Sequence, residues 1–193
     1  MVAELLRAGP TPRIDILAHG LRDEETAFRV EAAVIDALGL ERLLNRVRGW
    51  RSIELGRMPL RQLVVYYDAE PVRVRHPAVL IRINQRYQHG MSDTALYEAT
   101  RGVWRLSDER AKGARYALAI FEGVVREVYE IQAWHRAGST KYETRGKDDL
   151  VDPERIEFTG SVAAGAIRGV YLDRSVEAYF RRGAQSPVVY VNC

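Results

Sequence analysis

The sequence contains almost no cysteine and no long apolar stretch. Its one cysteine, Cys193, is the last residue, so an internal disulfide and a cysteine-based metal cluster are excluded. No apolar run approaches the ~20 residues that a membrane-spanning helix needs. The N-terminal stretch MVAELLRAGPTPR lacks the apolar core of a secretory signal. These absences predict a cytoplasmic protein with no membrane contact.

The common catalytic signatures are also missing. The sequence has no Walker-type glycine loop, no GxGxxG dinucleotide fingerprint and no GxSxG elbow. The four histidines match no metal-binding spacing and are scattered along the chain, at His19, His76, His89 and His135. We therefore expect no bound metal and no cofactor.

Lysine is scarce as well, and arginine supplies nearly all of the positive charge. Of the 29 basic residues, only Lys112, Lys141 and Lys147 are lysines. The planar guanidinium group suits bidentate contacts to phosphates and to guanine edges, which favours a nucleic-acid partner. The same composition also follows from a GC-rich genome, and a net charge of +3 is weak support for a polyanionic partner.

The length and composition are those of an ordinary globular protein, with 193 residues, 47% of them hydrophobic and 28% charged. We predict an α+β fold in which residues 1–70 are mostly helical and residues 71–76 form a linker. Residues 77–193 contain several short strands with one or two helices, which predicts a small β-barrel with peripheral helices.

In the N-terminal part, RIDILAHG alternates as a short strand does, and Asp23 is a good N-cap for a helix that ends near Leu38 and Gly39. Glu31 falls on the apolar stripe of this helix, where a carboxylate is costly unless it is paired or binds a cation. An ion pair with Arg46 or Arg48 is the simple explanation. MPLRQLVVYY is predicted as a second short helix or an extended segment.

In the C-terminal part, the pattern predicts strands over 78–84, 155–160, 166–172 and 186–192, and a pair of strands within 115–134 that is joined near Glu122 and Gly123. Helices are predicted over 92–100 and over 173–183, where Asp173 would be the N-cap and Gly183 the end. The polar stretch GSTKYETRGKDDLVDPE (138–154) is the clearest loop.

The stretch ATRGVWRLS (99–107) carries the strongest indication of a site, because Trp104 lies between Arg101 and Arg105, close to Gly102. Aromatic faces stack on bases and guanidinium groups hold phosphates, although single aromatic residues more often fill cores. The candidate nucleic-acid-binding residues are Arg82, Asn84, Arg86, Tyr87, Arg101, Trp104, Arg105, Trp134, Arg145 and Phe158.

The segment HGLRDEETAFRVEAAVIDALGLERLLNRVRG (19–49) resembles the C-terminal part of GIY-YIG nucleases, in the subfamily that also occurs with LEM and ankyrin domains. The resemblance implies that Glu31 stands where the family's helical glutamate binds the catalytic metal, and that the later asparagine of the family falls at Asn45. The sequence lacks the paired GIY and YIG strands and the arginine helix. Either the segment is a remnant kept as a scaffold, with Glu31 a vestigial metal ligand, or the start of the chain has been lost. We favour the remnant.

The second half is similar to a PUA-superfamily domain of the EVE, ASCH, YTH and SRA kind. The likeness covers residues 77–193 and follows the order of LIRINQRY, RGVWR, ALAIFEGVVREVYEIQAW, EFTG and PVVYVN. In bacteria such domains are often joined to nucleases and read modified bases. The sequence also resembles a small group of actinobacterial 5-methylcytosine DNA-binding proteins.

This resemblance implies a nucleoid-associated protein that binds double-stranded DNA and flips a modified cytosine into a pocket. Trp104, with Trp134, Tyr87 or Phe158, would form aromatic walls, and the amide of Asn84 would read the Watson–Crick edge. The remaining role would fall to Arg101, Arg105 and the loop with Arg145. These residues would hold phosphates or fill the gap that the flipped base leaves in the duplex.

Three other functions stay open on the sequence. A modification-dependent endonuclease would take its missing catalytic parts from a longer chain or a partner. An RNA-binding module is the second, since PUA relatives also bind RNA. The third is a protein-interaction domain that binds no nucleic acid.

Overall fold

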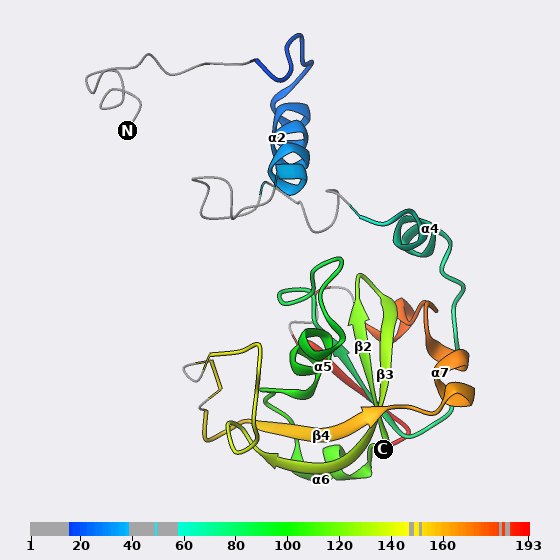
Figure 1. Cartoon of the computed structure of the whole chain (residues 1–193). Coiled ribbons are helices and arrows are strands. Elements are labelled where there is room, and N and C mark those ends of the chain that lie inside the picture. Colours follow the sequence, from blue (N-terminus) through cyan, green and yellow to red (C-terminus); the bar gives the residue numbers. More distant parts are fainter. Residues whose placement is uncertain are drawn as a thin grey trace, which may run out of the picture. The chain divides into compact units, whose positions relative to one another are not determined.

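The computed structural model describes residues 16–38, 49, 58–146, 149–150, 152–181, 183 and 186–193. The chain forms two compact units, Met1–Arg57 and Met58–Cys193 (Figure 1). Within the described ranges, no helix is long and apolar enough to cross a membrane.

The first unit contains the predicted helix, α2 (Glu24–Leu38). Asp23 caps it, because the backbone N–H of Thr26 donates to Asp23 Oδ1 at 2.7 Å. Ala32 and Ile35 are the buried positions, whereas Glu31 is exposed, so the expectation that Glu31 lies on a buried stripe is wrong. Its role as a vestigial metal ligand stays a prediction.

The described residues include only part of the other features predicted for this unit. Residues 16–20, the described end of the predicted strand, have no regular structure and are exposed. The predicted helix stop at Gly39 lies outside the described residues, and so do Asn45, Arg46 and Arg48.

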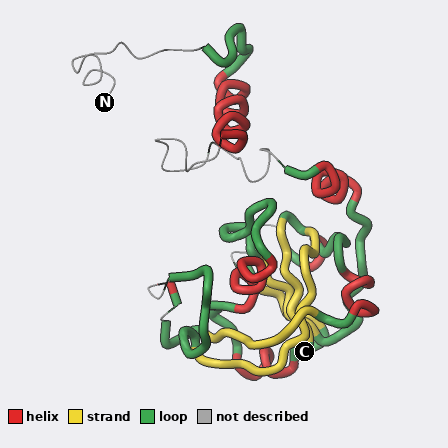
Figure 2. Tube along the Cα trace, viewed as in Figure 1, coloured by secondary structure: helices red, strands yellow, loops and turns green. Residues whose placement is uncertain are grey.

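The second unit is built on a mixed sheet of five strands in the order β4-β3-β2-β1-β5, so the fold is α+β. β1 is parallel to β2, and the other neighbouring strands are antiparallel. The strands are β1 (Ala78–Arg82), β2 (Tyr116–Phe121), β3 (Val124–Arg136), β4 (Ile156–Val162) and β5 (Val188–Val191). Figure 2 shows helices on several sides of this sheet.

The sequence of β1 and β2 explains why they lie in the centre of the sheet. Both are near-continuous apolar runs, AVLIR and YALAIF, and all their residues except Arg82 are buried. Strands that are covered on both faces have this composition. Polarity begins at Arg82, and this end of β1 leads into the candidate site.

The pairings found in the described part of the chain leave β4 and β5 as the edges of an open sheet. β3 is long and its pairing with β4 shifts register between Ile131 and Ala133, which marks a β-bulge. Beyond the sheet, Trp104 forms an isolated antiparallel bridge with Ile156 at the start of β4. The finer assignment, a PUA-like barrel, stays a prediction.

The hairpin between β2 and β3 is confirmed. Glu122 and Gly123 connect the strands with φ angles of 47° and 72°, and two successive positive φ values are what a two-residue type I′ turn requires. Asn84 holds this turn, because its Nδ2 donates to Glu122 Oε1 at 2.5 Å and its Oδ1 accepts from Glu122 N at 3.4 Å.

The helices of the second unit are partly as predicted. α5 (Asp93–Arg101) forms over the helix predicted for 92–100, and Ser92 caps it, because Ser92 Oγ accepts from Ala95 N at 3.2 Å. α4 (Leu60–Asp68) forms over the predicted short helix. α6 (Asp108–Gly113) is an element that the sequence reading missed.

The strand predicted over 166–172 is wrong, since these residues form most of α7 (Gly165–Tyr171). Ile167 and Tyr171 are one turn apart and both pack on the core, and tertiary packing of this face overrides the β-type composition. Figure 1 shows α7 beside the sheet.

The helix predicted over 173–183 is also wrong, apart from one 3₁₀ turn, η3 (Glu177–Tyr179). Asp173 has a φ of 61°, and its backbone N–H donates to Val125 O at 2.9 Å. Arg174 O accepts from Val125 N at 2.9 Å. These bonds to β3 replace those of a helix.

The segment predicted as a linker, residues 71–76, lies within the second unit. Val72 N donates to Ser175 O at 2.9 Å, and Val74 is buried. The hydroxyl of Tyr171 accepts from Arg75 N at 3.2 Å and shares a 2.5 Å hydrogen bond with His76 Nδ1. One fully buried tyrosine therefore fixes this segment to α7.

Replacing Tyr171 by Phe tests this attachment. The variant keeps the ring but removes the hydroxyl that accepts from the backbone N–H groups of Arg75 and His76 and bonds to His76 Nδ1, so we expect the free energy of unfolding to fall by about 0.5–1.5 kcal/mol. Urea denaturation measures it. Tyr67→Phe is the control, since Tyr67 is 71% exposed. Equal stability of both variants and the wild type would contradict the assigned role.

Candidate nucleic-acid interface

A cavity of about 400 Å³ opens beside the end of β1, and we call it the Trp104 cavity. Four of the predicted site residues line it, namely Arg82, Asn84, Arg86 and Trp104. The full lining consists of Arg82, Ile83, Asn84, Gln85, Arg86, Gly102, Val103, Trp104, Arg155 and Pro187.

The turn after β1 places the polar residues of this cavity. Ile83 is buried, and its backbone N–H donates to Ile120 O of β2 at 2.9 Å. Tyr87 N donates back to Ile83 O at 2.8 Å and closes the turn. Gln85 and Arg86 lie between these anchors, so a rigid strand end determines their position.

Trp104 is held by its backbone and by its indole nitrogen. Trp104 N donates to Ile156 O at 3.0 Å, Ile156 N donates to Trp104 O at 2.9 Å, and Nε1 donates to Thr100 O at 2.7 Å. The only polar atom of the side chain is thus satisfied within the protein. The partly buried ring lines the cavity and is available for stacking.

The neighbours of Trp104 do not act as predicted. Arg101 is 3% exposed, donates to Thr140 Oγ1 at 2.5 Å and to the carbonyl of Lys141, and lies 3.6 Å from the ring centroid of Tyr142. This placement does not fit the predicted phosphate contact. Arg105 is exposed, as a phosphate contact requires, and forms an ion pair with Glu154.

Gly102 is required by close packing inside the protein. A Cβ atom at this position would lie 2.8 Å from Glu157 Cβ, and the Tyr142 hydroxyl would be nearer still. The groups that approach Gly102 closely are therefore the protein's own Tyr142 and Glu157.

Two buried carboxylates fix that loop. Glu157 of β4 is fully buried and accepts hydrogen bonds from Gly138 N (2.9 Å), Thr140 N (2.9 Å), Thr140 Oγ1 (2.7 Å) and Tyr142 Oη (3.0 Å). Each is a charge-assisted bond, and together they satisfy the carboxylate. The loop over 138–142 is therefore tied to the strand that pairs with Trp104.

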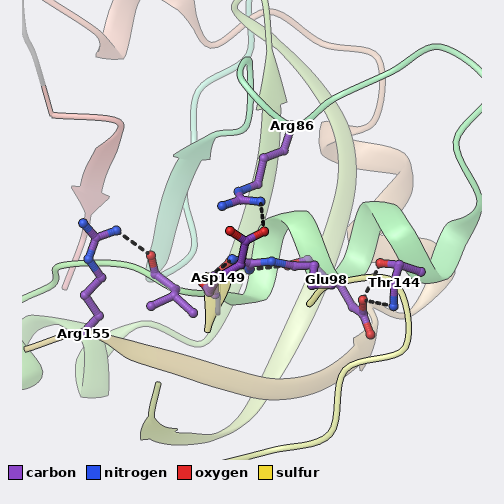
Figure 3. Close-up of polar contacts among 8 residues, drawn as sticks. Arg86, Glu98, Thr144, Asp149 and Arg155 are labelled. Atoms are coloured by element: carbon purple, nitrogen blue, oxygen red, sulfur yellow. Dashed lines mark hydrogen bonds and ion pairs between the residues drawn. The ribbon is translucent and has the colours of Figure 1, made fainter. Parts of the chain in front are cut away.

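Glu98 of α5 fixes the next residues of this loop, Glu143 and Thr144. It accepts from Glu143 N at 2.6 Å, from Thr144 N at 2.8 Å and from Thr144 Oγ1 (Figure 3). Arg145 completes the attachment, because Nη1 donates to Gly102 O at 2.5 Å and Nη2 to Asp149 O at 3.1 Å. The predicted role of Arg145 in filling a gap in the duplex does not fit these bonds.

The hydrogen bonds decide the charge of both carboxylates. Burial acts to raise the pKa of Glu98 and of Glu157, but the bonds from the loop act in the opposite direction and prevail. The pKa of each carboxyl is therefore lowered, and both groups are ionised at neutral pH.

The other predicted aromatic walls lie elsewhere. Tyr87 is buried and stacks on Phe121 at a centroid distance of 4.2 Å. Phe158 is fully buried between Tyr129 and Trp134. Trp104 is the one aromatic side chain among the lining residues of its cavity.

Trp134 itself lines a different cavity, of about 220 Å³. The other residues of that lining are Asp108, Lys112, His135, Arg136 and Ile156. Trp134 therefore cannot form a second wall of the Trp104 cavity.

Asn84 lines the cavity, but its amide is engaged by the Glu122 turn described above. The sequence reading missed Gln85, whose exposed side chain makes no hydrogen bond among the described residues. An amide offers both a donor and an acceptor, and Gln85 is the neighbouring amide that is available. The only feature of the sequence that could have indicated Gln85 as a site residue is its position directly after Asn84.

Arg155 was also missed. Its Nη1 lies 3.4 Å from Val103 O, to which it donates, and its Nε pairs with Asp152 Oδ2 at 2.7 Å. Arg86 pairs with Asp149 at 3.8 Å, and Figure 3 shows Arg86 and Arg155 from two separate segments. With Arg82 the cavity has three arginines and no carboxylate in its lining, so every charged side chain of the lining is cationic.

Comparisons with family models, with curated proteins and with solved structures found no match to this chain. In the described part of the sequence, no group of three or more His, Cys, Asp and Glu side chains is arranged to hold a metal ion.

Acid should weaken the attachment of the loop. Because the pKa of Glu157 lies below its ordinary value of 4.5, its contribution is complete above that pH and is lost as the pH falls through the lower, folded-state pKa. Glu157→Gln should lower the free energy of unfolding at pH 7 by about 1–3 kcal/mol and flatten its decline in acid.

Urea denaturation at a series of pH values from neutral to acidic measures both effects. Glu154→Gln is the matched control, because the Glu154 side chain is 67% exposed. Parallel pH profiles for Glu157→Gln and the wild type would show that the buried carboxylate does not govern acid stability.

Proposed function

We propose that the protein binds double-stranded DNA and accepts a modified cytosine, 5-methylcytosine, that has been extruded from the duplex into the Trp104 cavity. The observation that carries the proposal is the combination of one fixed aromatic ring with three arginines at a single cavity. An extruded nucleotide offers a π face of its base for stacking and an anionic phosphate for arginine, so an aromatic ring beside arginines suits it.

The size of the cavity suits this ligand. Its volume of about 400 Å³ lies in the range of about 300–1,000 Å³ of typical ligand pockets. Ile83, Val103 and Pro187 provide apolar lining for the base and its methyl group. Burial of one methyl contributes only about 1 kcal/mol, so the shape of the lining must supply part of the discrimination.

The polar lining divides into two roles. Gln85 would hydrogen-bond the Watson–Crick edge, a role that the sequence reading gave to Asn84. Arg82, Arg86, Arg155 and the exposed Arg105 would hold phosphates. Asn84 would act indirectly, by holding the hairpin turn beside the cavity.

The finer family assignments belong to the same proposal. The Met58–Cys193 unit would be a PUA-like domain of the base-reading kind, and α2 would be a GIY-YIG remnant that acts as a scaffold. A DNA-binding function would associate the protein with the nucleoid. Magnesium-dependent cleavage of a methylated plasmid, abolished by Glu31→Ala, would instead identify an endonuclease.

The central test is binding of the full chain to a short fluorescent duplex with and without 5-methylcytosine, at fixed salt. We expect tighter binding to the methylated duplex. Trp104→Ala should weaken it by about tenfold to a hundredfold, because stacking contributes about 1–3 kcal/mol per base. Trp104→Phe should retain most of the affinity.

Trp134→Ala is the matched control, since Trp134 is also partly buried but lines another cavity. Circular dichroism confirms that each variant is folded. Equal affinity for both duplexes would contradict base reading, and tighter binding to the corresponding RNA strand would identify an RNA-binding module.

A further inference from the structure

Another cavity, of about 330 Å³, adjoins the Trp104 cavity, and we call it the α5 cavity. The two share Gln85 and Arg86 as lining residues. The remaining lining of the α5 cavity consists of Gln88, Met91, Ala95, Ala99, Thr144 and Arg145. The function proposed above does not use this space.

The small side chains of α5 provide the room. Ala95 and Ala99 are one turn apart on the helix, on the side that faces the cavity. Thr144 and Arg145 form the opposite part of the lining, and Glu98 holds them against α5. The α5 cavity is therefore bounded by a helix and by a loop that is fixed to it.

The charges indicate an anionic ligand. Arg86 and Arg145 line the cavity, and no carboxylate does. Burial, and then the like charge of Arg86, lowers the pKa of Arg145, so an anion that lies between the two guanidinium groups would relieve their repulsion.

The hydrogen bonds of these two arginines leave capacity for a ligand. Within the described structure, Arg145 Nε is buried and has no hydrogen-bond partner. Arg86 lies 3.8 Å from Asp149 Oδ2, which is beyond hydrogen-bond length. Because that atom is buried, an anion in the cavity would act on Arg145 through its charge, and the exposed guanidinium group of Arg86 would donate the hydrogen bonds.

A further cavity, of about 460 Å³, which we call the Arg168 cavity, shows the contrast. It also contains an arginine, Arg168, but Glu127 binds that guanidinium group through two hydrogen bonds of 2.7 and 2.8 Å. Asp93 adds a second carboxylate to the lining. Carboxylates form part of this lining, unlike that of the α5 cavity, so this cavity carries no comparable preference for anions.

We propose that the α5 cavity is a subsite for the nucleotide that is covalently linked to the extruded one, with the phosphodiester between them held by Arg86 and Arg145. The inference rests on the proposed function, because it places the extruded base in the Trp104 cavity. Gln85 and Arg86 lie where the two cavities meet, so the chain would pass beside them.

Calorimetric titration of the full chain with short ligands tests the subsite. The ligands are 5-methyldeoxycytidine 5′-monophosphate and the two dinucleotides that carry a thymidine on its 5′ or its 3′ side. We expect one dinucleotide to bind at least about tenfold more tightly than the mononucleotide, equivalent to about 1.4 kcal/mol. Ala95→Leu should fill the subsite and remove this gain without changing mononucleotide binding.

Thr94→Leu is the matched control, because Thr94, the adjacent residue of the same helix, lines the Arg168 cavity instead. Ala95→Ser keeps the space and should keep the gain. Leucine is a good helix former, and circular dichroism verifies that α5 is retained.

The outcomes separate the two proposals. Equal affinity for the mononucleotide and both dinucleotides, or a gain that persists in Ala95→Leu, would overturn the subsite and leave base binding intact. If neither the mononucleotide nor a dinucleotide binds, the base-binding function fails and the subsite fails with it.

Discussion

The burial of the Glu157 carboxylate is the constraint on which the candidate site depends. Four hydrogen bonds from the loop over 138–142 make this charge tolerable in the interior. Ile156, the preceding residue, pairs with Trp104, and Glu157 itself packs on Gly102. One ionised side chain thereby sets the distance between the loop, the edge strand and the tryptophan of the cavity.

Local signals in the sequence predicted much of the fold. The caps at Asp23 and Ser92, the turn at Glu122 and Gly123, and the apolar runs of β1 and β2 act over a few residues, so their effects can be deduced without knowing the tertiary structure. The strand prediction for the segment after Gly165 failed because the apolar spacing of that segment fits either a strand or a helix. The packing of Tyr171 decides between the two.

The candidate site was less predictable, because residues of the same type have opposite roles in it. Arg101 and Arg105 flank one tryptophan, yet the first is buried under Tyr142 and the second is exposed. The difference arises because Arg101 is the last residue of α5 and faces the loop. The sequence did not identify Arg155 as a site residue, because its approach to Val103 depends on the tertiary contact between two segments that are distant in the sequence.

Three arginines at or beside the Trp104 cavity already have acidic partners, in the pairs Arg86–Asp149, Arg105–Glu154 and Arg155–Asp152. The three carboxylates lie within six residues of one another, so the surface carries its own counterions on a single segment. A phosphate that binds one of these arginines displaces a carboxylate, and that carboxylate then takes up a cation from solution. Fewer ions are released in total than the arginine count implies, so binding should depend less steeply on salt. Sequence-independent attraction to the DNA backbone is reduced in the same exchange, which leaves a larger share of the binding free energy to the contacts with the base.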